Sequence, residues 1–226
     1  LDEVSIIFCV NKINNYKIDS RIKVVYYDDS LIYTDRILHN IKDLNYNYIL
    51  FLHEDWIITN NFSNDTNLKV INFMNKKNIF HIRSYKNYGS SNKKPEIFHE
   101  DINICNIPND SGNFISLQPG LWEKNIFKEL YSIKCDKPNL LESKSNHIFR
   151  SKYNNKFYYE KDSLLAQDSK MFPHIHTIAY GRWAMCNDKY DKLNSLLMEY
   201  NINKFKRGYF NRNTGEDIKS CIKNCV

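Results

Sequence analysis

Three short, predominantly apolar runs in the first quarter of the chain constrain its fold most. They are rich in β-branched and aromatic residues and span Val4–Val10, Ile22–Tyr27 and Tyr48–Leu52. A predominantly apolar run of this length is typical of a strand that is buried on both faces, as in a parallel sheet covered by helices. These runs therefore predict a buried sheet of an α/β fold.

Segments with helical spacing of apolar residues separate the predicted strands. Leu31–Leu44, Leu68–Lys76 and Asp188–Tyr200 have this spacing, and further short apolar runs occur at Ile79–Ile82 and Phe114–Leu117. Strands that alternate with helices predict a mostly parallel central sheet flanked by helices. Because no linker, repeat or change of composition interrupts the pattern, we expect one domain over residues 1–226.

The second half of the chain leads to four local expectations. We expect a helix after Pro119-Gly120 that contains Trp122, a loop at Pro138–Glu142, an extended segment from Pro173, and a flexible loop at Gly181–Trp183. These expectations rest on Gly and Pro positions and on the spacing of apolar residues.

Charge and cysteine content narrow the partners and the compartment. The net charge is +6, from 32 basic and 26 acidic residues, but the lysines are scattered, so we expect no nucleic-acid partner. The six cysteines form no C-x-x-C pair and no regular framework, which predicts reduced thiols in the cytoplasm and no zinc site.

The apolar segments are too short to cross a membrane, so no transmembrane segment is predicted. The first ten residues have no basic leader and no cleavage site, and they are not predicted to be a signal peptide. The sequence begins without Met, as a fragment of a longer, multidomain chain would.

Two acidic residues, Glu54 and Asp55, directly follow the apolar run Tyr48–Leu52. Ligands of open α/β sheets bind outside the carboxyl ends of the strands, and carboxylates supply the oxygen ligands that Mg²⁺ or Mn²⁺ prefers. Adjacent side chains of an extended chain point to opposite sides, so only one of the two would bind the metal directly. The alternative interpretation is an acidic pair that forms a turn at the strand end.

The runs VSIIFCVNK, YYDDS and YILFLHED together resemble the nucleotide-binding half of glycosyltransferases with the GT-A fold. The resemblance is best over Tyr26–Trp56 and implies a Rossmann-like domain that binds a nucleotide-sugar donor in residues 1–83 and an acceptor in residues 84–226. It gives Glu54 the contact to the donor sugar and Asp55 the metal, which would be Mn²⁺ or Mg²⁺.

The resemblance also proposes Asn11, Asp28 and Asp29, by their positions, as contacts to the donor nucleotide. The sequence departs from the family pattern at two places. The acidic pair is Glu-Asp rather than Asp-x-Asp, and the connection from Asn11 to Arg21 is short for a crossover between parallel strands.

In the second half, FISLQPGLWEKNIFKEL resembles the acceptor side of small GT-A enzymes. That resemblance would place Trp122 against a sugar face, although its helical spacing with Ile126 is equally typical of a core residue. The segment Pro138–Glu142 resembles the part of inverting enzymes that carries the catalytic base. This gives Glu142 the role of base, with a solvated helix cap as the alternative and Asp136, Glu123 or Asp168 as substitutes.

The segment PHIHTIAYGRW holds two histidines at alternate positions, His174 and His176, which share one face if the segment is extended. Some GT-A enzymes add a histidine near the C-terminus as a metal ligand, which makes both His174 and His176 candidates, and we select His176. Arg182 would close over the donor diphosphate from a flexible loop. The alternative is a pair of histidines hydrogen-bonded within the structure.

Together these features predict a glycosyltransferase of the hexosyltransferase type that moves a sugar from a nucleotide diphosphate donor to a hydroxyl of a glycan or glycoconjugate. We expect it to invert the anomeric configuration and to depend on a metal. A retaining enzyme would leave Glu142 without its role. The alternative from another class is a non-catalytic GT-A-like domain that binds glycan or nucleotide.

Overall fold

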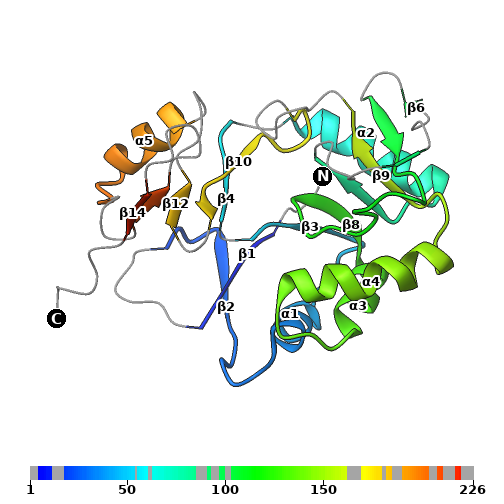
Figure 1. The fold of residues 1–226 in the computed structure, drawn as a ribbon, viewed down its shortest axis with the longest axis horizontal. Coiled ribbons are helices and arrows are strands. Elements are labelled where there is room, and N and C mark those ends of the chain that lie inside the picture. Colours follow the sequence, from blue (N-terminus) through cyan, green and yellow to red (C-terminus); the bar gives the residue numbers. More distant parts are fainter. Residues whose placement is uncertain are drawn as a thin grey trace.

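A six-stranded sheet forms the centre of the computed structural model (Figure 1). The strand order is β3-β8-β5-β9-β7-β6. These strands are β3 (Tyr48–Phe51), β5 (His81–Arg83), β6 (Ile97–His99), β7 (Ile104–Asn106), β8 (Gly120–Glu123) and β9 (Phe157–Glu160). The structure describes residues 5–11, 18–53, 55–60, 63–84, 91–92, 97–99, 103–161, 169–179, 182–184, 190–203, 208–210 and 217–219.

Helices cover both faces of this sheet. Figure 1 shows α2 (Asn64–Lys77) above the sheet and α3 (Lys124–Ser132) and α4 (Pro138–Lys152) below it. Side chains alternate between the two sides: Leu121 joins the core under α2, whereas Trp122 joins the core of α3 and α4. Both faces of the sheet therefore carry an apolar core, as expected for a sheet that helices cover on both sides.

The sheet is mixed rather than mostly parallel. Among the described strands of the central sheet, only β5 and β9 pair in parallel, and β3, β8, β7 and β6 join their neighbours in antiparallel. The prediction of strand direction fails because an apolar run reports that two faces are covered and does not report the direction of the neighbouring strand.

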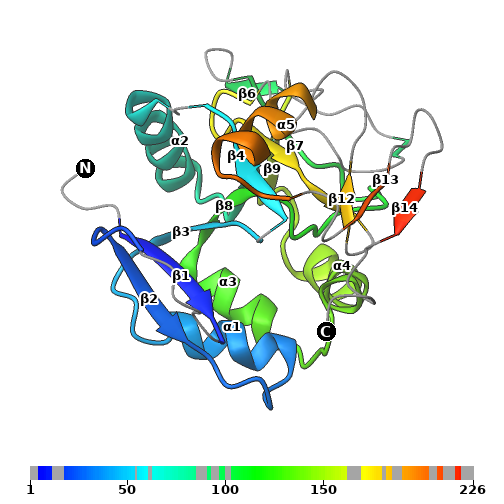
Figure 2. The same ribbon diagram turned by 90° about the vertical axis from the view of Figure 1, so that its left-hand side faces the viewer.

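A separate parallel pair precedes the central sheet. It consists of β1 (Ile6–Val10) and β2 (Ile22–Tyr26), which are in register from Ile6 opposite Ile22 to Val10 opposite Tyr26. Helix α1 (Tyr33–Ile41) follows β2, and Figure 2 shows this pair beside α1. Both strands and the helix lie where we predict them, despite the short connection between the strands. The prediction that these strands are buried is wrong, because Ile6, Phe8 and Tyr26 are 53%, 46% and 58% exposed in this separate pair.

The C-terminal part contributes a ribbon and a second sheet. The ribbon pairs β4 (Trp56–Ile58) with β10 (His174–His176) in antiparallel. The sheet has the order β11-β12-β13-β14 and lies near α5 (Tyr190–Glu199), which confirms the predicted C-terminal helix (Figure 1). Its strands are β11 (Ile178–Ala179), β12 (Arg182–Ala184), β13 (Gly208–Phe210) and β14 (Asp217–Lys219). None of the helices in the described ranges is long and apolar enough for a bilayer.

Three local predictions are wrong. Phe114–Leu117 forms no strand but is a buried irregular segment, and Trp122 lies in β8 rather than in the following helix. Pro138–Glu142 is the start of α4, with Pro138 in its first turn, rather than a loop. Proline is well tolerated at this position because its missing N–H would have no partner in the first turn of a helix.

The centre of the sheet is packed so closely that β8 needs a glycine. The rings of His81 and Trp122 stack at 3.6 Å between centroids, and both residues are fully buried. A Cβ atom on Gly120 would lie 2.6 Å from Nε2 of His81 and 2.7 Å from the carbonyl oxygen of Ile82. Gly120 therefore allows β8 to approach β5.

Two buried histidines make the fold sensitive to acid. Burial lowers the pKa of His81 well below its usual value, and the nearby charge of Arg83 lowers it further. Burial also lowers the pKa of His174 to about 4. Both rings are neutral in the folded protein at neutral pH, whereas an unfolded histidine takes up a proton below a pH of about 6.5.

We predict that the free energy of unfolding decreases as the pH falls below about 6.5, because the unfolded chain binds more protons there. Each buried histidine contributes up to about 1.4 kcal/mol per pH unit in this range. Urea unfolding at pH 8, 7, 6 and 5 measures the slope. His81→Leu, which cannot be protonated, is expected to have a shallower slope between pH 6.5 and pH 5. An identical slope in the variant would contradict the assignment.

Candidate functional site

The ribbon of β4 and β10 brings Asp55 and His176 together beyond the carboxyl end of β3. Nε2 of His176 lies 2.8 Å from Oδ2 of Asp55, although the residues are 121 positions apart. The backbone carbonyl of Asp55 accepts hydrogen bonds from the amide of Thr177 at 2.7 Å and from its hydroxyl at 3.0 Å. The two predicted metal ligands are therefore in contact, at the start of the ribbon.

A tight turn connects β3 to this place. The amide of Trp56 donates to the carbonyl of His53 at 3.1 Å and closes the turn that contains Asp55. Glu54, the proposed contact to the donor sugar, lies outside the described residues. Oδ1 of Asp55 is buried and has no hydrogen-bond partner within the described part of the chain. Asp55 thus uses one carboxylate oxygen toward His176 and retains acceptor capacity on the other.

Alternation along the ribbon separates its two faces. Ile57 and Ile175 belong to the core cluster packed by α5. The ring of Trp56, on the opposite face, lies 4.9 Å from that of His174 and 4.7 Å from that of His176. The prediction that the two histidines share one face is confirmed, because residues two apart on a strand point to the same side.

The two histidines have different environments. His174 is fully buried, and its Nδ1 lies 2.5 Å from the carbonyl oxygen of Phe172 and 3.5 Å from Oγ of Ser84. The side chain of His176 is 42% exposed. His174 is therefore one of the internally hydrogen-bonded histidines that the sequence left as an alternative, while His176 faces solvent beside Asp55.

Next to the turn, the side chains of His53, Tyr33 and Tyr131 form a row of polar groups linked by hydrogen bonds. We did not predict this row from the sequence. The hydroxyl of Tyr33 in α1 is 3.1 Å from Nε2 of His53 and 3.1 Å from the hydroxyl of Tyr131 in α3. Burial raises the pKa of Tyr131 well above its usual value, and Tyr33 and the charge of Glu142 add to the shift. The only available signal in the sequence was His53 at the end of an apolar strand.

Glu142 is near this row and anchors the segment that precedes β8. Its Oε1 accepts hydrogen bonds from the amide of Leu117 at 2.6 Å and from Oγ of Ser116 at 3.0 Å. One turn later on α4, Oδ1 of Asn146 accepts from the amide of Ile115 at 2.7 Å. Glu142 and Asn146 thus bind backbone amides of residues 115–117 that a neighbouring strand would otherwise bind.

The residues proposed for the nucleotide meet at the end of β1 and β2. Nδ2 of Asn11 donates to Oδ2 of Asp29 at 2.6 Å, and Asp28 accepts from the amide of Ser30 at 2.8 Å. This hydrogen bond to Ser30 lowers the pKa of Asp28. Arg36 of α1 donates to the carbonyl of Asp29 at 2.5 Å. The structure brings Asn11 and Asp29 into contact, and part of their polar capacity is used within the turn.

Two other candidates lie in regular structure. Trp122 is fully buried in the core, which corresponds to the core interpretation, and no face of its ring is open to solvent. Arg182 begins strand β12, so the predicted loop over the diphosphate is a strand at this residue. Glu123, a substitute for the base, caps α3 by accepting from the amide of Ile126. Asp168, another substitute, lies outside the described residues, and Asp136 is exposed.

The Asp55–His176 pair has suitable chemistry for a divalent cation. The part of the chain that the structure describes contains no group of three or more His, Cys, Asp or Glu side chains that could hold a metal ion. Two protein ligands leave coordination positions of the cation free for a further ligand. An imidazole nitrogen beside a carboxylate suits Mn²⁺ better than Mg²⁺, which prefers an all-oxygen environment.

Comparisons with known proteins do not identify a family. No protein-family model matches the chain. No curated protein matches its sequence.

The anchoring role of Glu142 predicts a clear effect on stability. We expect Glu142→Ala to lower the free energy of unfolding by about 1.5–3 kcal/mol, as for the loss of hydrogen bonds to a charged group. Glu142→Gln keeps an acceptor oxygen and should lose less than half as much. Denaturant unfolding of both variants measures the difference. Equal stability of wild type and Glu142→Ala would show that residues 116–117 do not depend on this anchor.

Proposed function

We propose that the protein is a metal-dependent glycosyltransferase that uses a nucleotide diphosphate sugar and acts at the carboxyl end of β3. The observation that carries the proposal is the 2.8 Å contact between Asp55 and His176. The resemblance names both residues as metal ligands, and they are in contact although 121 positions separate them in the chain.

In this proposal, Asp55 and His176 hold Mn²⁺ or Mg²⁺ together with the donor diphosphate. The cation, when bound, offsets the negative charge that grows on the leaving diphosphate. Oδ1 of Asp55, which has no hydrogen-bond partner among the described residues, and the exposed side chain of His176 support this arrangement. Asn11 and Asp29, which lie at the ends of β1 and β2, would contact the nucleotide.

Transfer to an acceptor hydroxyl requires a base, and we propose Glu142 for this role. In an inverting reaction the acceptor oxygen forms a bond to the anomeric carbon while the bond from that carbon to the diphosphate oxygen breaks. The hydroxyl proton passes to a carboxylate oxygen. Oε1 of Glu142 accepts hydrogen bonds from Ser116 and Leu117, and none of the described residues donates a hydrogen bond to Oε2. Oε2 would accept the proton.

The second candidate is a non-catalytic domain of GT-A type that binds nucleotide or glycan. The engagement of Glu142 as an anchor favours it, because an acidic residue with a structural role does not require chemistry. Donor hydrolysis and sugar transfer in the presence of Mn²⁺ separate the two candidates, since a binding domain would bind the donor without turning it over.

The metal prediction is tested by calorimetry with UDP, GDP, ADP and CDP, each with and without Mn²⁺. At least one nucleotide should bind more tightly with Mn²⁺, and Asp55→Asn and His176→Gln should each remove that gain. Asp43→Asn and His147→Gln change exposed residues elsewhere and serve as matched controls. Metal-dependent binding that survives both site variants would place the cation at other residues.

The base prediction is tested with Glu142→Gln, which keeps the anchor oxygen. We expect the transfer rate to fall by about 10²–10⁴-fold, the usual range for loss of a general base. Donor affinity should stay near the wild-type value, because the base acts in the transition state. NMR of the product should show an inverted anomeric configuration. A retained configuration or near-normal turnover would remove Glu142 from the mechanism.

A further inference from the structure

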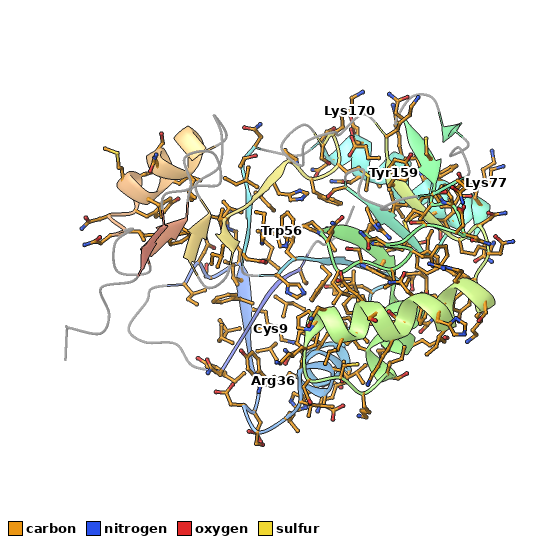
Figure 3. The ribbon with its side chains drawn as sticks, in the orientation of Figure 1. Cys9, Arg36, Trp56, Lys77, Tyr159 and Lys170 are labelled. Carbon is orange, nitrogen blue, oxygen red and sulfur yellow. The ribbon has the colours of Figure 1, made fainter. Side chains whose placement is uncertain are left out.

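Trp56 lies between two imidazole rings of the same strand. Its centroid is 4.7 Å from that of His176 with 30° between the planes, and 4.9 Å from that of His174 with 70° between the planes. The register of the ribbon causes this arrangement, since Trp56 is the direct partner of His176. Figure 3 labels Trp56, the first residue of β4, near the middle of the molecule.

His174, Trp56 and His176 form a row of three rings. Its inner end, His174, is fixed in the protein interior. His174 is fully buried and is held by the carbonyl of Phe172 and by Ser84. Its ring and the indole form a T-shaped pair, a geometry that aromatic rings prefer. The position of the indole is thus determined from the side of the core.

The outer end of the row is the exposed histidine. With 42% of its side chain exposed, His176 would have freedom to change rotamer, and each rotamer-rich group that must be ordered on binding reduces affinity. The indole restricts the imidazole on one face, and Asp55 restricts it at Nε2. The backbone of Asp55 is in turn held by Thr177.

We infer that Trp56 is a positioning residue that keeps the ring of His176 directed at Asp55. Its action has two physical parts. The indole limits the orientations of His176 before any ligand binds. Its electron-rich face also favours a ring that carries positive charge, as an imidazole does when it binds a cation. The cation part rests on the proposed function, whereas the orientation of His176 does not.

Two substitutions at Trp56 separate the aromatic contact from simple bulk. Trp56→Phe keeps an aromatic face, and Trp56→Leu keeps an apolar side chain without one. NMR of the histidine rings reports the contact directly, because the ring current of the indole shifts the Cε1 proton of His176. We expect that shift to be lost in Trp56→Leu and partly kept in Trp56→Phe, with similar thermal unfolding of the two variants.

The effect on the cation is measured by calorimetry with Mn²⁺ and the nucleoside diphosphate that the wild type binds best. Trp56→Leu should weaken the Mn²⁺-dependent affinity by about 2- to 5-fold, in the range of an exposed cation–π contact, and Trp56→Phe by less. Without Mn²⁺, Trp56→Leu should leave the affinity for that nucleotide unchanged, because the indole acts through the histidine that would hold the cation.

Each outcome decides a separate point. An unchanged Cε1 shift of His176 in Trp56→Leu would overturn the inference. An equal loss of nucleotide affinity with and without Mn²⁺ would also overturn it, since Trp56 would then act by another route. If Trp56→Leu does not fold, the ring shift and affinity of Trp56→Phe still decide. If the wild type binds no nucleotide with Mn²⁺, the proposed function fails, while the NMR measurement still tests the positioning of His176.

Discussion

Burial of the six-stranded sheet on both faces is the constraint from which the other features follow. The stack of Trp122 on His81 at 3.6 Å lies within this sheet, and Gly120 is needed there because a Cβ atom would meet the neighbouring strand. Close packing at such a site leaves no room for adjustment. His81 is packed here in its neutral form, so we expect protonation of this ring at low pH to destabilise the centre of the fold.

The candidate site depends on this rigid centre because its parts come from distant segments. β3 ends at Phe51, the turn closed by Trp56 places Asp55, and β10 brings His176 from the other end of the chain. Behind the turn, Tyr33 and Tyr131 join α1 and α3 to His53. Sites whose supporting residues are held by packing keep their geometry better than sites on free loops.

The sequence predicted an element correctly where a single local pattern, an apolar run or a helical spacing of apolar residues, determined it. The apolar run Tyr48–Leu52 is strand β3, and the periodic segment Asp188–Tyr200 contains α5. The prediction failed for Trp122, whose spacing with Ile126 suggested a helix, because β8 ends directly before α3 and the spacing crosses the boundary. It failed for Phe114–Leu117 because Glu142 and Asn146, rather than a neighbouring strand, satisfy that segment. The Mn²⁺ site, the donor and the base remain predictions.

The sequence by itself determined where β1, β2, β3 and most of the helices lie, and it predicted one shared face for His174 and His176 if their segment is extended, since these features depend on periodicity within short segments. It also singled out Asp55 and His176 as a possible pair. Only the tertiary structure decided that the central sheet is mixed, that His174 is sealed inside while His176 is exposed, and that Glu142 anchors residues 116–117. The physical reason is that strand direction and side-chain partners are set by contacts between segments far apart in the chain, and those contacts leave no periodic trace in the sequence.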